Sequence, residues 1–130
     1  GHGHIVNLVS TAGLIASAKS SLYSATKFAG IGFSNALRLE LMPYNVYVTT
    51  VNPGPIKTAF FDKADPDGSY VKAVDKYILE ADTVAKQIVN NFGKKKRELI
   101  MPFTLKAAHK LYTLFPNLGD KLASKMFNYK

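Results

Sequence analysis

Short apolar runs rich in β-branched residues alternate along this chain with segments of helical pattern. The runs cover residues 5–9, 46–52 and 98–102. A helical pattern follows each run, at residues 20–42, 82–91 and 103–127. Strands that alternate with helices are typical of right-handed crossovers, which place the strands parallel in one sheet. The order therefore predicts an α/β fold with about three parallel strands and a helical tail.

Composition limits the classes of protein to which the chain can belong. Of its 130 residues, 47% are hydrophobic, which suits a globular domain rather than a disordered one. The chain has no cysteine, so disulfides and cysteine-based zinc sites are excluded. No apolar run reaches the roughly 18 residues that span a bilayer, and we expect no signal peptide. We expect a reducing, cytoplasmic location.

The predicted sheet is thin, because a parallel sheet normally needs helices on both faces. Around it we expect Ser20 or Ser21 to cap the first helix, and close packing to explain Gly30 and Gly32 within it. Asp82 is the expected cap of the helix at 82–91. We expect residues 59–72 to be irregular, with a turn at residues 65–68.

Tyr23 and Lys27 stand four positions apart, so a helix would place them on one face. An ammonium group close to a phenol favours the phenolate, which makes the tyrosine a useful acid or base for a carbonyl–alcohol pair. Ser10 follows the first strand, where open α/β sheets place their ligands. Its hydroxyl could hold the same oxygen atom. Tyrosine–lysine pairs are common on helix surfaces, so this pair alone does not indicate catalysis.

The whole pattern resembles the short-chain dehydrogenase/reductase family. The segment GHIVNLVSTAG is similar to the strand that carries the catalytic serine, and YSATK matches the Tyr-x-x-x-Lys signature. The serine lies thirteen residues before the tyrosine, and VNPGPIKT resembles the Pro-Gly strand end beside the nicotinamide. The resemblance covers roughly residues 3–102. It implies the carboxy-terminal part of a Rossmann-like, doubly wound sheet over residues 1–102, with 103–130 as an amphipathic basic extension.

The resemblance also implies roles for individual residues. Tyr23 would exchange the proton with the substrate, Ser10 would orient the carbonyl, and Lys27 would assist Tyr23 and hold the ribose hydroxyls. The implied cofactor is NAD or NADP, and the substrate is a small carbonyl compound or alcohol. The cofactor would be bound by Tyr23, Lys27, Pro53, Gly54, Ile56 and Thr58. A lobe at residues 59–76 would cover the substrate with Phe60, Phe61 and Tyr70.

The family's dinucleotide-binding half, with its glycine-rich phosphate turn, would precede Gly1. Gly30 and Gly32 fall within a predicted helix and cannot replace that turn. Asn7, within the strand, is expected to make a structural hydrogen bond instead of serving in catalysis. We therefore expect the isolated chain to be inactive, and its uncovered sheet to favour a homo-oligomer.

A non-catalytic module for oligomerisation or for binding a membrane surface is the alternative. Residues 94–130 hold nine Lys or Arg against two acidic residues, out of a net charge of +8 for the chain. Within the tail, Leu105, Ala108, Tyr112 and Phe115 share one predicted helical face, which could rest on a membrane, the sheet or a neighbouring subunit. We do not expect nucleic-acid binding, because the basic run at 94–97 lacks interleaved aromatics. His2 and His4 at the chain end do not suggest a metal site.

Overall fold

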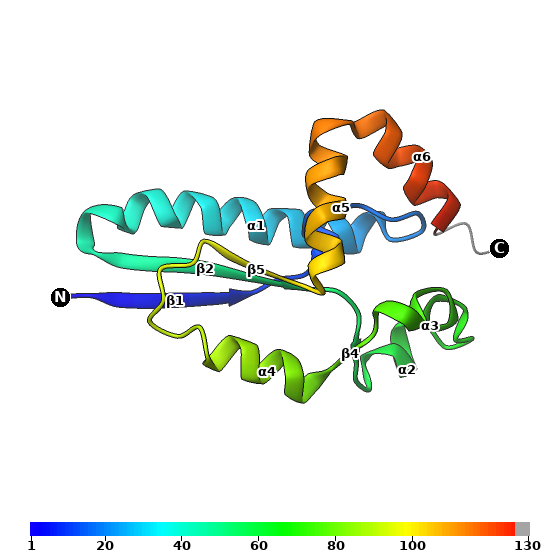
Figure 1. Cartoon of the computed structure of the whole chain (residues 1–130), viewed down its shortest axis with the longest axis horizontal. Coiled ribbons are helices and arrows are strands. Elements are labelled where there is room, and N and C mark those ends of the chain that lie inside the picture. The colour runs from blue at the N-terminus through cyan, green and yellow to red at the C-terminus, as the bar shows by residue number, and fades with distance from the viewer. Residues whose placement is uncertain (127–130) are drawn as a thin grey trace.

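The computed structural model describes residues 1–126, so the last four residues of the predicted tail lie outside the described part. Three parallel strands form the main sheet: β1 (Gly3–Leu8), β2 (Val46–Pro53) and β5 (Glu98–Met101). Their order in the sheet is β1-β2-β5, with β2 in the centre (Figure 1). The predicted α/β fold with three parallel strands is confirmed.

Helices lie on both faces of the sheet (Figure 1). On one face, α4 (Ala81–Val89) packs Val84 and Ile88 against Val51 and Leu99, the centre of the hydrophobic core. On the other face lies α1 (Ser21–Leu41), which is joined to β1 by a hydrogen bond of 2.9 Å from the amide of Asn7 to Ser34. The expected structural role of Asn7 is confirmed.

The ends and contacts of the helices differ from several predictions. Ser20 occupies the N-cap position of α1, but its side chain makes no capping hydrogen bond. The cap expected at Asp82 is wrong, because α4 begins at Ala81 with Glu80 in the cap position. Gly30 lies close to the side chain of Val9, as expected. Gly32 is exposed and has no neighbour within 4 Å, so packing does not explain it.

Residues 59–72 are not irregular, contrary to the prediction. They contain α2 (Phe60–Ala64) and the start of α3 (Ser69–Val74), followed by a 3-10 turn at Asp75–Tyr77. A second sheet, which the sequence did not suggest, pairs β3 (Ile56–Lys57) with β4 (Leu79–Glu80) and ties this lobe to the end of β2. The predicted turn at 65–68 is present, with the Gly68 amide donating to the Asp65 carbonyl over 3.0 Å.

The tail forms two helices, α5 (Phe103–Leu114) and α6 (Pro116–Met126), with the predicted break at Pro116. Leu105 and Tyr112 of the predicted apolar stripe are partly buried, whereas Ala108 and Phe115 are exposed. The basic residues 94–97 precede β5, and the hairpin of α5 and α6 follows it (Figure 1). The lysine-rich tail is therefore divided between opposite ends of the sheet and is not one basic patch.

Among the described residues, no helix has the length and apolar character needed to cross a membrane.

Candidate active site

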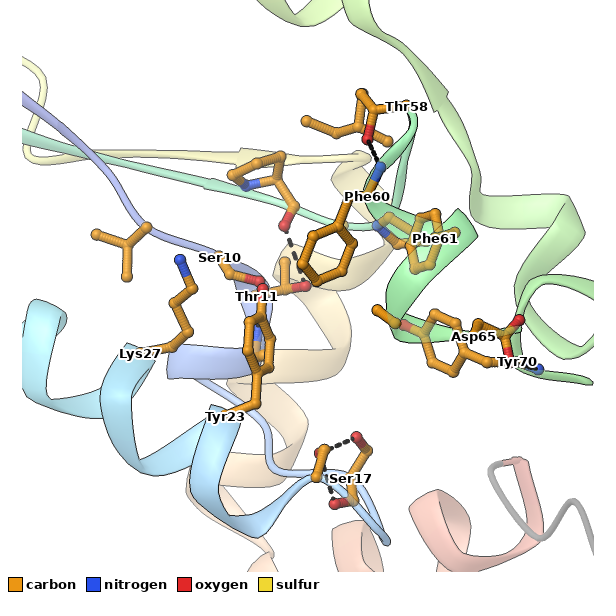
Figure 2. A pocket seen from close by; sticks show the side chains of 18 of the residues that line it. Ser10, Thr11, Ser17, Tyr23, Lys27, Thr58, Phe60, Phe61, Asp65 and Tyr70 are labelled. Carbon is orange, nitrogen blue, oxygen red and sulfur yellow. Dashed lines mark hydrogen bonds between the residues drawn. The ribbon is translucent and has the colours of Figure 1, made fainter. Parts of the chain in front are cut away.

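A cavity of about 840 Å³ lies at the carboxyl ends of β1 and β2. All the residues expected at the site line it: Ser10, Tyr23, Lys27, Pro53, Gly54, Ile56, Thr58, Phe60, Phe61 and Tyr70. They come from two strand ends, α1 and the lobe that contains α2 and α3 (Figure 2). The volume falls within the range of small-molecule binding sites.

Ser10 stands at the N-cap of a 3-10 turn, Thr11–Gly13, directly after β1. Its Oγ accepts a hydrogen bond of 3.1 Å from the backbone N–H of Ala12. This bond uses a lone pair of the hydroxyl and leaves its proton available. The Thr11 hydroxyl donates to the carbonyl of Pro53 over 3.3 Å, which joins the serine segment to the end of β2.

Gly13 sets how closely the serine segment approaches α1. A Cβ atom at Gly13 would lie 2.6 Å from the carbonyl oxygen of Lys27 and 2.9 Å from the side chain of Ile31. Only glycine allows this approach, and the approach occurs at the helical turn that carries Lys27. The sequence alone does not indicate this role of Gly13, because it depends on a contact between segments that are distant in the chain.

Tyr23 and Lys27 lie one turn apart on α1, as their spacing predicts. The Lys27 Nζ is 5.5 Å from the centroid of the Tyr23 ring, within the range of a cation–π contact. Tyr23 is 40% exposed, and its ring points from α1 towards the Ser10–Thr11 segment (Figure 2). The Phe60 ring lies 6.2 Å from it, across the cavity. Tyr23 is therefore accessible to a ligand and flanked by a cation and an aromatic ring.

The end of β2 forms a second wall of the cavity. The Gly54 amide donates to the carbonyl of Met101 over 2.7 Å, which fixes the turn after Pro53 against β5. The N–H of Leu79 in β4 donates to the carbonyl of Pro55 over 2.8 Å, which joins the turn after β2 to the second sheet. Thr58 accepts a bond of 3.3 Å from the amide of Phe60 at the start of α2.

Three aromatic rings in contact with one another form the lobe side of the cavity. Phe61 lies edge-on to Phe60 at 5.3 Å and stacks on Tyr70 at 5.6 Å. The carboxylate of Asp65 accepts hydrogen bonds from the amides of Tyr70 and Val71, over 3.1 and 2.8 Å. It thereby satisfies two free N–H groups in the first turn of α3 and holds Tyr70 in place. The sequence showed Asp65 as a turn residue, and its acidic character before a helix could have indicated this role.

A group of serine hydroxyls, which the sequence pattern did not indicate as part of the site, lies at the start of α1. Ser20 Oγ lies 2.7 Å from Ser17 Oγ and 3.2 Å from Ser24 Oγ, and it donates to the carbonyl of Ser17 over 2.9 Å. Ser17 and Ser20 line the cavity, as does the neighbouring Lys19, whose φ of 62° is in the left-handed region. These residues make one side of the cavity polar.

His4 has a structural role within the described chain. Its Nδ1 accepts a bond of 3.0 Å from the Gly93 amide, so its Nε2 carries the proton and donates to Thr49 over 2.8 Å. Among residues 1–126, no group of three or more His, Cys, Asp or Glu side chains could hold a metal ion.

Comparison with known proteins identifies one matching family model and several related sequences. The family model for short chain dehydrogenases matches residues 1–69. The chain is 36% identical over 127 residues to dehydrogenase/reductase SDR family member 7B of Xenopus laevis, covering 94% of this chain and 39% of that protein. It is 34% identical over 125 residues to dehydrogenase/reductase SDR family protein 7-like of Dictyostelium discoideum, covering 95% of this chain and 39% of that protein.

Solved structures share the fold. A short-chain dehydrogenase from Burkholderia cenocepacia, in complex with NADP, superposes with a TM-score of 0.73 at 20% identity, over 96% of this chain and 47% of that one. A short-chain dehydrogenase from Sphingobium yanoikuyae, in complex with NADPH, gives 0.67 at 26% identity, over 93% of this chain and 44% of that one.

The chain spans less than half the length of these relatives. Within that span, the family model covers more than half of the chain, including the segment from Ser10 to Lys27 and the Pro-Gly end of β2. The Rossmann-like arrangement of β1, α1 and β2 agrees with it. The chain belongs to the short-chain dehydrogenase family.

Proposed function

We propose that this chain forms the substrate-binding half of an NAD(P)-dependent oxidoreductase that interconverts a carbonyl compound and an alcohol. The observation that carries the proposal is the gathering of Ser10, Tyr23 and Lys27 around one cavity at the carboxyl edge of the sheet. This is where open α/β sheets bind their ligands.

The three residues have complementary roles in this proposal. The Tyr23 hydroxyl gives a proton to the carbonyl oxygen during reduction and takes it back during oxidation. The Ser10 hydroxyl, whose proton is available, donates a hydrogen bond to the same oxygen and stabilises its developing charge. Lys27 places a positive charge beside the Tyr23 ring, where it stabilises negative charge that develops during the proton transfer.

The cavity suits the nicotinamide end of NAD or NADP, the cofactors that family membership implies. Its volume admits a nicotinamide ring together with a small substrate, and one wall is the largely apolar segment Pro53–Gly54–Pro55–Ile56. In the proposed complex, this wall and Thr58 contact the nicotinamide, and Tyr23 and Lys27 bind the ribose hydroxyls. The bound cofactor would supply or accept the hydride.

The substrate in this proposal is a small molecule with a substantial apolar part. Phe60, Phe61 and Tyr70 present aromatic surface to the cavity, and Ser17 and Ser20 present hydroxyls on the side near α1. A carbonyl compound with one apolar end and one hydrogen-bonding end would match both surfaces.

The proposed activity depends on the dinucleotide-binding half. Gly30 and Gly32 lie in the middle of α1, and no strand-to-helix turn among residues 1–126 is rich in glycine. The chain by itself therefore lacks the usual means of holding the pyrophosphate, and we propose that it is inactive alone.

Isothermal titration with NADH and NADPH tests whether cofactor binding requires the dinucleotide-binding half. The measurement compares this chain with a longer chain that adds the dinucleotide-binding half. We expect binding by the longer chain only. Binding of similar affinity by both chains would contradict the claim that half of the site is missing, and binding by neither would contradict the proposed function.

A further inference from the structure

The hairpin of α5 and α6 ends in a group of exposed apolar side chains. Leu114 and Phe115, at the turn between the helices, are 72% and 58% exposed. Leu111 on α5 and Leu118 on α6 flank the turn and are also exposed. We call these four residues the hairpin tip. Figure 1 shows the hairpin rising from the carboxyl end of the sheet past α1, with this turn far from the strands.

The tip is not needed for packing within the described fold. Leu105 of α5 lies against Gly54 at the end of β2. A Cβ atom added to Gly54 would be only 2.8 Å from the Cδ1 atom of Leu105. Tyr112, two turns further along the same face, packs against Gly119 of α6. These residues hold α5 to the sheet and to α6. The tip side chains stay exposed, as at sites of interaction.

The charge around the tip is strongly positive. Residues 103–125 contain Lys106, Lys110, Lys121 and Lys125 but only one acidic residue, Asp120. The Asp120 carboxylate already accepts a hydrogen bond of 3.0 Å from Tyr112. Lys110 directly precedes Leu111 on α5, Lys121 follows Leu118 by three residues on α6, and both lysines are exposed. An apolar tip is thus flanked by lysines on both helices.

We propose that the hairpin tip docks this protein on an anionic membrane surface. The apolar side chains would enter the boundary between headgroups and acyl chains, and the lysines would contact anionic headgroups. A symmetric contact with a second copy would place the same patch against itself, bringing Lys110 and Lys121 close to like charges. Anionic lipid complements both properties of the patch. This proposal concerns a surface apart from the cavity and does not depend on the proposed catalysis.

Sedimentation of the chain with vesicles tests the proposal. We expect binding to vesicles of phosphatidylcholine with phosphatidylserine, little binding to phosphatidylcholine alone, and weaker binding as salt is raised. The double substitution Lys110→Gln/Lys121→Gln should weaken binding by roughly fivefold per lysine. The matched control, Lys94→Gln/Lys96→Gln, removes the same charge at the opposite end of β5 and should have a much smaller effect.

A fluorescent label tests whether the tip itself enters the lipid. Because the chain has no cysteine, Phe115→Cys and Val89→Cys each give a single attachment site for an environment-sensitive dye. Both side chains are exposed, so neither change should disturb folding. We expect a blue shift and an increase in emission with phosphatidylserine vesicles for the label at 115 only.

Four results would overturn the proposal. The first is the absence of binding to anionic vesicles by the folded chain. The second is an equal loss of binding in the two lysine variants, which would indicate attraction without a specific surface. The third is an equal dye response at 115 and 89. The fourth is self-association through the hairpin tip. Light scattering without lipid would reveal it as a lower mass for Leu114→Ser than for the parent chain.

Discussion

Tyr23 and Ser10 reach one cavity from different segments of the chain, and their proposed roles can be separated by substitution. In a longer, cofactor-binding chain, Tyr23→Phe should lower kcat by about 10²- to 10⁴-fold, because it removes the proton donor. Ser10→Ala should lower kcat by about 10²-fold or more, because it removes one donor to the substrate oxygen. Steady-state kinetics and cofactor titration measure both effects.

Tyr44→Phe is the matched control for Tyr23→Phe, because Tyr44 is exposed in the 3-10 turn Met42–Tyr44 before β2 and does not line the cavity. It should leave kcat unchanged. Full activity of the Tyr23 variant, or equal loss in both tyrosine variants, would refute the role given to Tyr23.

Gly13 permits a contact that any other residue would break. Gly13→Ala should lower the free energy of unfolding by about 1–3 kcal/mol, because its methyl group would overlap the backbone of α1 at Lys27. Gly32→Ala, on the exposed side of α1, should be neutral or stabilising by up to about 1 kcal/mol. Urea denaturation measures both changes. Equal effects would show that the close approach at Gly13 does not matter for stability.

At the scale of single residues, the sequence indicated the residues with proposed catalytic roles but not the residues that hold the site in place. Ser10, Tyr23 and Lys27 were found because their spacing is a local pattern. Gly13, Thr11 and Asp65 were missed as parts of the site because their roles depend on contacts with Lys27, Pro53 and α3. No local pattern specifies such contacts.

At the scale of elements, strong patterns were reliable and short elements were not. The three parallel strands and α1 follow from long runs of suitable residues. The strands β3 and β4 have two residues each and carry no recognisable period. The helix α3 is six residues long and depends on the carboxylate of Asp65 for two of its free amides. Tertiary contacts therefore decide the structure of this lobe.

The contact between α5 and α6 should depend on pH. The hydrogen bond from Tyr112 to Asp120 raises the pKa of Tyr112 above its usual value, with smaller contributions from burial and from the Asp120 charge. A pKa raised by folding stabilises the protein below the unfolded pKa, and this contribution is lost as pH rises through the folded pKa. The hairpin should thus lose about 0.5 kcal/mol above roughly pH 10.

Tyr112→Phe provides the comparison for this prediction. The variant keeps the ring that packs against Gly119 but lacks the ionisable hydroxyl. The difference in free energy of unfolding between the two proteins, measured from about pH 8 to about pH 11, should shrink as pH rises. A difference that stays constant across this range would show that the hydrogen bond does not contribute to stability.

At the scale of the whole molecule, the sequence predicted the architecture but not the distribution of charge. Nine basic residues in 94–130 look continuous in the sequence. The strand β5 divides them, and at its amino end Arg97 contacts Asn35 and Lys95 lies over the Tyr47 ring. Only the group on α5 and α6 accompanies the hairpin tip. The direction of one four-residue strand therefore determines which lysines can act together.

The outward side of α1 carries exposed apolar side chains that suit self-association. Phe33 is 63% exposed, and Leu39 and Phe28 are also exposed along the same helix, beside Ala25, Ala29 and Ala36. A second copy of the chain could cover this face with an identical apolar surface, as in symmetric dimers. We expect a dimer at micromolar concentration. Phe33→Glu should weaken it at least about tenfold, because the contact would bury an unpaired carboxylate.

Light scattering and sedimentation velocity measure this association. Leu114→Ser, which removes an apolar side chain of similar exposure from the hairpin tip, should leave the dimer intact. A monomeric parent chain would contradict the prediction. A dimer that survives Phe33→Glu would place the interface elsewhere, with the edge of β1 as the next surface to test, because β1 has β2 as its only strand partner among the described residues.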